Sequence, residues 1–335
     1  MTAPAHKREV GRGERLLPGV WRLRLPLPWP GVPHCNAWAV AAGDGIVLFD
    51  TGMHQPGSMA NLERALEMVG LKVEHVRLVV CTHAHSDHYG QAATIVERAG
   101  CELWMHSDHG HMTANVDDPE AAAERRLEIA RSAGVPEEPL RQWAQARRGQ
   151  PFGIAGIVEP ARDLLPGVVV KTDLGGWEVV LTPGHAPSHV CLWQPERRML
   201  ISGDHLLGRV SPYYDYGYSP DPAGEFLTSL DRVEALDARL CLSGHGRTFT
   251  DVQGHIAANR ELIARRLGAL EEALREDGAV TAFDAVPRVF GEAMTAMNAN
   301  WWLSETLCYL THLERLGRVE RIPGEDGGPE RWTQA

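Results

Sequence analysis

The stretch CTHAHSDHYG, residues 81–90, constrains this chain more than any other, because it crowds three histidines and an aspartate behind an apolar run. That run, VRLVV at 76–80, is typical of a buried strand. Four polar donors packed at a strand end are costly in free energy unless something neutralises and bonds them. A divalent metal ion does both, and imidazole nitrogen with carboxylate oxygen suits zinc, iron or manganese. The cluster therefore predicts a metal site.

Three more donors follow other apolar runs in the same way. His185 comes after WEVVLTPG, Asp204 after MLISG, and His245 after ARLCLSG. The ends of strands in an open sheet are where sites are built, because the loops there converge on a rigid frame. The complete donor set is His83, His85, Asp87, His88, His185, Asp204 and His245. Seven donors exceed one tetrahedral shell, so they favour two metals sharing a carboxylate.

The rest of the first 255 residues reads as an α/β layer architecture. VWRLRLPL at 20–27 alternates like a half-buried strand, Gly-Asp-Gly at 43–45 indicates a hairpin, and 58–69 has helical periodicity. Residues 115–149 are rich in Ala, Glu and Arg and predict a helical insertion of two helices broken near 134–136. We therefore expect one α/β domain over 15–255 that contains this insertion.

The C-terminal part changes character. Residues 256–277 carry apolar side chains on one helix face, and two further helices with a short strand are predicted before 321. These features predict a small helical unit over 256–321. The sequence after it, 322–335, reads PGEDGGPERWTQA from Pro323 onward and predicts a disordered tail.

Charge and cysteine content limit the partners and the location. The formal net charge is −11, which disfavours nucleic acid and anionic membrane surfaces as partners. No run approaches the roughly 20 apolar residues that span a bilayer. The six cysteines form no CxxC pair, so a reducing cytoplasm is the expected location.

Five motifs in order, LFDTG, THAHSDH, TPGHAPSH, SGDH and SGHG, resemble the metallo-β-lactamase superfamily over roughly 20–250. The resemblance implies an αββα sandwich with two divalent metals, most simply Zn²⁺ with Mn²⁺ or Fe²⁺ as alternatives, at one edge of the paired sheets. It implies that Asp204 bridges the two metals. The resemblance also implies roles for the other residues: His83, His85 and His185 on the first metal; Asp87, His88 and His245 on the second; Asp50 as a residue that orients a ligand. His189 lies close to a predicted ligand in the sequence, which predicts that it supports a ligand rather than binds a metal itself.

Two such metals would generate a bridging hydroxide, with Asp87 as the catalytic residue that orients it. The preferred hypothesis is a hydrolase of a small carboxylic thioester, ester or lactone. The C-terminal unit resembles the winged-helix appendage of a subgroup with thioesterase-like (glyoxalase-II-like) and endoribonuclease-like members. A phosphodiesterase or endoribonuclease on the same metals, and a mono-iron sulfur dioxygenase, stay open as alternatives.

The substrate pocket is less determined by the sequence. The loop 211–225 carries four tyrosines just after Asp204, and they are candidates to line it: Tyr213, Tyr214, Tyr216 and Tyr218. The insertion is a candidate lid or homodimer surface. His106, His109 and His111 follow another strand end, but the family motif does not use them as ligands. We expect a small-molecule substrate as the partner.

Overall fold

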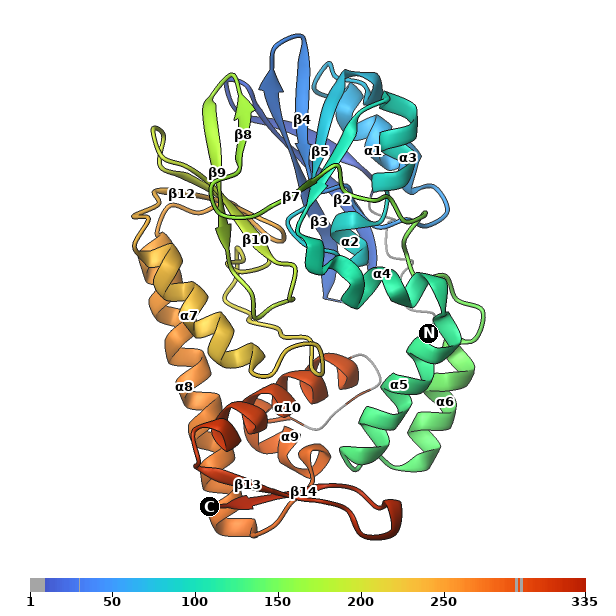
Figure 1. The fold of residues 1–335 in the computed structure, drawn as a ribbon, viewed down its shortest axis with the longest axis vertical. Coiled ribbons are helices and arrows are strands. Elements are labelled where there is room, and N and C mark those ends of the chain that lie inside the picture. Colours follow the sequence, from blue (N-terminus) through green and yellow to red (C-terminus); the bar gives the residue numbers. More distant parts are fainter. Residues whose placement is uncertain (1–9, 30, 293–294, 296–297) are drawn as a thin grey trace, which may run out of the picture.

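The computed structural model describes residues 10–29, 31–292, 295 and 298–335. Two sheets pack face to face with helices on both outer sides (Figure 1). The first sheet has seven strands in chain order: β1 Arg12–Leu17, β2 Val20–Trp29, β3 Val32–Ala42, β4 Gly45–Phe49, β5 Val76–Val80, β6 Glu102–Met105 and β7 Arg162–Asp163. The second runs in the order β12-β11-β10-β9-β8: β8 Val169–Thr172, β9 Gly175–Leu181, β10 Val190–Gln194, β11 Met199–Gly203 and β12 Leu240–Ser243.

The inner faces of the two sheets form one apolar layer. Large side chains from both sheets meet there, and the rings of Phe49 and Trp177 lie 5.6 Å apart between centroids. The strands β4 to β7 are parallel to one another, so their carboxyl ends lie at the same edge. The predicted αββα sandwich is confirmed, and its edge is placed to collect the loops that follow the strands.

The outer face of the first sheet is covered by α1, Ser58–Glu67, and α3, Ala92–Ala99. The helix expected over 58–69 forms but ends two residues earlier, where the chain turns through Gly70. The hairpin predicted at 43–45 also forms, because Ala42 pairs with Gly45 between β3 and β4. Short 3₁₀ turns at Val73–His75, Ser107–His109 and Glu325–Gly327 connect other elements.

The predicted insertion is helical and projects from the sandwich (Figure 1). Residues 115–149 contain the end of α4, Gly110–Asp117, and the two complete helices α5, Pro119–Ser132, and α6, Glu137–Arg147. Helix α5 begins where expected from capping chemistry: the Asp118 carboxylate accepts a hydrogen bond from the Ala121 N–H at 2.9 Å, and Pro119 occupies the first turn. The break between α5 and α6 falls at 133–136, in agreement with the sequence.

Helix α7, Pro222–Glu234, lies against β9 on the outer face of the second sheet. The helices of the C-terminal region pack against one another: α8 Val252–Asp277, α9 Ala282–Phe290 and α10 Ala299–Arg315. Two of them, α8 and α10, also contact α7. A single apolar cluster contains Leu200 and Cys241 of the sheet together with Leu270 of α8 and Leu310 of α10. The helices therefore share one apolar core with the outer face of the second sheet.

The tail predicted to be disordered over 322–335 is ordered, and that prediction is wrong. Residues Arg331–Gln334 form β14, which pairs antiparallel with β13, Val319–Ile322. The physical reason is Trp332, whose side chain is fully buried under the guanidinium of Arg321, 4.5 Å from its ring centroid. Burial of an indole ring stabilises the folded chain enough to order a short polar segment around it.

None of the helices in the described part of the chain combines the length and the apolar composition needed to cross a membrane.

Candidate metal centre

The seven donors arrive at one edge of the sandwich from four strand ends. His83 and His85 follow β5, and the single helical turn α2, Ser86–Tyr89, carries Asp87 and His88. The loops after β9, β11 and β12 deliver the other three: His185, Asp204 and His245. All seven are buried or nearly so. Donors that lie far apart in the sequence thus meet in one cage.

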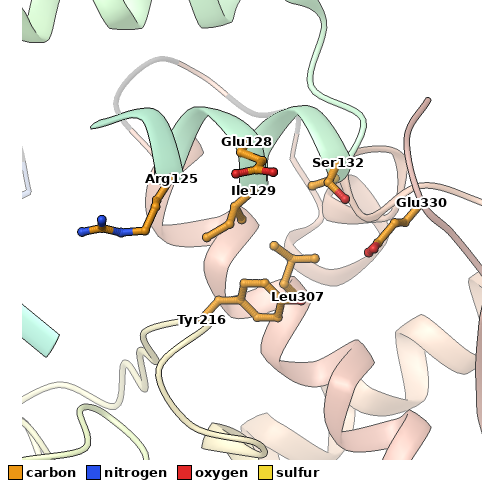
Figure 2. Close-up of a pocket in the computed structure, with 8 residues that line it drawn as sticks. Arg125, Glu128, Ile129, Ser132, Tyr216, Leu307 and Glu330 are labelled. Atoms are coloured by element: carbon orange, nitrogen blue, oxygen red, sulfur yellow. The ribbon is translucent and has the colours of Figure 1, made fainter. Parts of the chain in front are cut away.

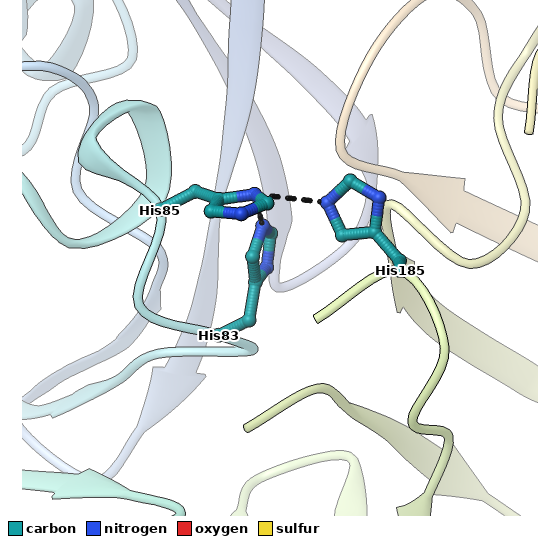
Figure 3. Close-up of side chains that lie close together, drawn as sticks. All are labelled: His83, His85 and His185. Atoms are coloured by element: carbon teal, nitrogen blue, oxygen red, sulfur yellow. Dashed lines mark hydrogen bonds between the residues drawn. The ribbon is translucent and has the colours of Figure 1, made fainter. Parts of the chain in front are cut away.

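Three histidines form the first group (Figure 3). Nδ1 of His85 lies 3.0 Å from Nε2 of His83 and 2.9 Å from Nε2 of His185. Figure 3 shows the three rings turned toward a common point from two separate chain segments. Three imidazole nitrogens on one point are the ligand set of a catalytic zinc site with an open position.

Two carboxylates and two histidines form the second group. Nε2 of His245 lies 3.1 Å from Asp87 and 3.2 Å from Asp204, while Nε2 of His88 lies 3.2 Å from Asp204. Nε2 of His88 and Oδ1 of Asp204 are buried, yet neither meets hydrogen-bond geometry with any described group. Orphaned buried polar atoms are costly, and a cation between them would satisfy both. The donors fit a metal ion.

Asp204 connects the groups. One of its oxygens lies 3.2 Å from His88, and the other lies 3.7 Å from Nε2 of His185 in the first group. Its carboxylate approaches the neighbouring backbone closely because Gly244 leaves room: a Cβ at that position would lie 2.2 Å from the Asp204 carboxylate. Asp204 therefore occupies the position that the resemblance gives to the bridging ligand.

Each of the five histidines also has an outward nitrogen held by an acceptor. The partners are Asp50 for His88 at 2.8 Å, the His34 carbonyl for His245 at 2.9 Å, the Tyr213 carbonyl for His185 at 3.0 Å, Asp215 for His85 at 2.5 Å and the Thr82 hydroxyl for His83 at 3.0 Å. An outward N–H donated to such an acceptor leaves the inward nitrogen with its lone pair free. This is the tautomer that binds a metal.

The structure places both predicted orienting residues beside the donors. Asp50, in the left-handed region at φ 62°, accepts hydrogen bonds from the Thr82 N–H at 2.8 Å and the Thr82 hydroxyl at 3.0 Å while it contacts His88. Nε2 of His189 accepts a hydrogen bond from the Asp204 N–H at 3.1 Å. Asp50 thus holds the side chain of His88 in place, and His189 holds the backbone of Asp204 in place.

The cage has strong internal electrostatics. Burial lowers the pKa of His83 well below its ordinary value, and the charges of neighbouring histidines act in the same direction. Burial also acts to lower the pKa of His245, but Asp204 and Asp87 outweigh it and raise that pKa to about 10. The two carboxylates of the second group therefore stabilise a positive charge beside them. A bound cation supplies that charge, or a proton on His245 does.

Sequence reasoning missed Asp215. Its carboxylate lies 2.5 Å from Nε2 of His85 and accepts a hydrogen bond from the Tyr213 hydroxyl at 2.9 Å. His111 approaches the same pair: one ligand atom from each of His85, His111 and Asp215 falls within a 4.8 Å spread. The sequence signal that could have found it is its position as an acidic residue between tyrosines in the loop after Asp204.

Three of the four candidate tyrosines border hollows next to the cage, and Tyr214 does not. Tyr213, Tyr216 and Tyr218 line a hollow that also includes Asp215. Tyr214 is fully buried in the apolar core, with its ring 5.2 Å from Phe226 and 5.6 Å from Tyr309. The pocket prediction is wrong for Tyr214, because this ring fills space between α7 and α10.

Known proteins resemble this chain along nearly its whole length. A sequence model described as the metallo-beta-lactamase superfamily matches residues 30–245. The chain is 24% identical over 317 residues to the probable metallo-hydrolase YqjP of Bacillus subtilis, covering 92% of this chain and 94% of that protein. It is 23% identical over 264 residues to an atrochrysone carboxyl ACP thioesterase of Aspergillus chevalieri, covering 76% and 68%.

A solved structure supports the same relationship. A metallo-beta-lactamase family protein from Thermus thermophilus superposes with a TM-score of 0.81 at 28% identity, covering 96% of this chain and 100% of that one. The match therefore extends through the C-terminal helices as well as the sandwich. Since family sequence, fold and donor cage agree, the chain belongs to the metallo-β-lactamase superfamily, as one of its metal-dependent hydrolases.

Proposed function

We propose that this hydrolase cleaves a small carboxylic thioester, ester or lactone with two divalent metals, most simply zinc. The observation that carries the proposal is Asp204, whose two oxygens approach a three-histidine group on one side and His88 and His245 on the other. Bound there, two divalent cations would lower the pKa of a water and polarise the attacked carbonyl. The thioesterase named above is a relative that acts on an acyl thioester, which supports this substrate class.

The chain's own residues have separable tasks in this reaction. Asp87, whose Oδ2 lies 3.1 Å from His245, is placed to accept a hydrogen bond from the attacking water and set its direction. The buried cage excludes bulk water, so charge that develops on the acyl oxygen is stabilised more strongly than in solution. The net charge of −11 disfavours a nucleic-acid substrate.

Turnover of matched acyl panels tests the proposal. Protein loaded with zinc, manganese or iron is expected to hydrolyse members of acyl-thioester, ester and lactone panels, and Asp87→Asn is expected to lower kcat by about 10²–10⁴-fold. Metal analysis of the variant controls for loss of the site. Phosphodiester cleavage without any acyl hydrolysis would contradict the substrate class. One iron per chain with sulfur oxidation would contradict the hydrolytic reaction itself.

A further inference from the structure

Two hollows lie between helix α5 of the insertion and helix α10 of the C-terminal region. The inner one, about 150 Å³, is bordered by Tyr213 and Asp215, and the outer one is about 360 Å³. Figure 2 shows the outer hollow, with Ile129 of α5 facing Leu307 of α10 and Tyr216. Four residues line both hollows: Arg125, Ile129, Tyr216 and Leu307. The hollows therefore adjoin each other across these residues, and together they form what we call the groove, whose size suits a small molecule.

The inner hollow adjoins the metal centre on the outer side of two donors of the first group. Asp215 at its inner end contacts His85 of the first metal group at 2.5 Å, and the Tyr213 ring lies 5.7 Å from the ring of His185. The wall formed by the tyrosine loop is held in place, because the Ser304 hydroxyl of α10 donates to the Tyr214 carbonyl at 2.8 Å and accepts from the Tyr216 N–H at 3.0 Å. A substrate with its reacting carbonyl at the donors would have this preformed hollow within reach of its other end.

Two arginines of α5 give the inner hollow its charge. Arg126 lines only the inner hollow, and Arg125 lines both. Neither guanidinium forms an ion pair with a carboxylate in the part of the chain that the structure describes; Arg125 donates to the Asn115 side chain at 2.8 Å, and Arg126 lies 5.4 Å over the ring of Phe152. In contrast, Arg131 on the same helix lies 3.6 Å from Glu137.

The two hollows differ in their charged residues. The outer hollow includes two acids, Glu128 and Glu330, while Arg126 lines only the inner hollow. Asp215 places one negative charge at the inner end, where it contacts His85 and the Tyr213 hydroxyl. A guanidinium in a partly enclosed hollow binds a carboxylate or phosphate through strong charge-assisted hydrogen bonds. Two guanidiniums against this one carboxylate leave the inner hollow with a net positive charge, in a protein whose own net charge is −11.

We propose that the inner hollow binds an anionic group of the substrate, a carboxylate or a phosphate, through Arg126 assisted by Arg125. This inference rests on the proposed acyl hydrolysis and narrows its substrate class to elongated acyl compounds with a second, negatively charged end. Ile129, Leu303 and Leu307, which line the same hollow, then contact the apolar part of the substrate. The anion lies either on the acyl chain or on the leaving group.

Matched substrates separate these two sources. Glutaryl and pentanoyl thioesters of N-acetylcysteamine differ by a carboxylate on the acyl side, and pentanoyl thioesters of phosphopantetheine and pantetheine differ by a phosphate on the leaving group. We expect one charged member to exceed its neutral partner by about 10-fold or more in kcat/KM. Arg126→Gln should remove this preference by raising KM for the charged substrate more than for its neutral partner. Arg126→Lys should retain part of it, and Arg131→Gln on the same helix should behave like the wild type.

A binding measurement distinguishes failure of this inference from failure of the proposed function. Titration calorimetry of the zinc-loaded protein with glutarate and with inorganic phosphate requires no turnover. Binding of either anion that is lost in Arg126→Gln supports the pocket, even if no acyl substrate is hydrolysed. The pocket is overturned if neither anion binds the wild type, if Arg126→Gln binds and discriminates like the wild type, or if the variant slows charged and neutral substrates equally.

Discussion

The Asp50 carboxylate lies 2.8 Å from Nδ1 of His88, and both side chains are buried. The contact orients the ring so that Nε2 faces the second metal group. Asp50→Asn is expected to weaken metal binding by about 10–100-fold, because an amide is a poorer acceptor for the His88 N–H. Competition against a zinc chelator measures the change. Asp44→Asn, which alters an exposed carboxylate paired with Arg77, is the control and should leave affinity unchanged.

Substitution of Asp215 should also weaken metal binding, but only at the first group, the three histidines His83, His85 and His185. Asp215→Asn weakens the hold on Nε2 of His85, so Nδ1 no longer points steadily at His83 and His185. We expect about 10–100-fold weaker binding of one metal, with the second unaffected. Visible spectra of the cobalt-substituted protein during titration report each site. Equal weakening of both sites would contradict this assignment.

Removal of single ligands tests the number of metals. The two groups are separate apart from Asp204, so His185→Ala and His245→Ala should each reduce the bound metal from two ions per chain to about one. Mass-spectrometric metal analysis after gel filtration measures the content. A wild-type protein with a single ion at saturating metal would refute the two-metal arrangement.

Trp332 should carry much of the stability of the C-terminal hairpin. Its side chain is fully buried, so Trp332→Ala is expected to lower the free energy of unfolding by about 3–5 kcal/mol. Ile322→Ala on the paired strand is the control, because Ile322 is 42% exposed and its loss should cost about 0.5 kcal/mol or less. Urea unfolding of the two variants makes the comparison. A small effect of Trp332→Ala would show that the hairpin contributes little to the shared core.

Glu305 should make stability depend on pH. Burial raises its pKa from 4.5 to about 7, although Arg266 and the Tyr309 hydroxyl act to lower it. The folded chain therefore keeps a proton that the unfolded chain has released between about pH 4.5 and 7, and the free energy of unfolding falls as pH rises through that window.

The size of this effect is at most about 3 kcal/mol, and Glu305→Gln should remove it. Unfolding of both proteins at several values between about pH 5 and 7.5 gives the two slopes. Parallel slopes would mean that Glu305 titrates at its ordinary value in the folded protein.

The sequence was sufficient to predict the two-sheet sandwich and the donor cage, because both depend on patterns within short stretches of the chain. Apolar runs marked the strands, and a donor just past each run marked the edge at which the loops converge. Asp215 could not be found in this way, because it reaches His85 across 130 positions from an irregular loop without periodicity. The loop also has no periodic pattern that would predict which side chains point inward. The sequence therefore could not show that Tyr214 is buried in the core while Tyr213 and Tyr216 border the groove. Trp332 was missed because its polar surroundings are typical of disorder, while its burial depends on contacts with distant helices.

The order of the donors along the chain also determines when, during synthesis, each of the two groups has all its donors. The first group needs His185 and the second needs His245, which follows the last strand of the second sheet. A nascent chain that has emerged only through α5 displays His83, His85, Asp87 and His88 with no partners to complete either shell. Neither group can therefore bind a metal with its full set of donors until late in synthesis, and a cation held earlier by residues 83–88 alone has fewer ligands and exchanges more readily.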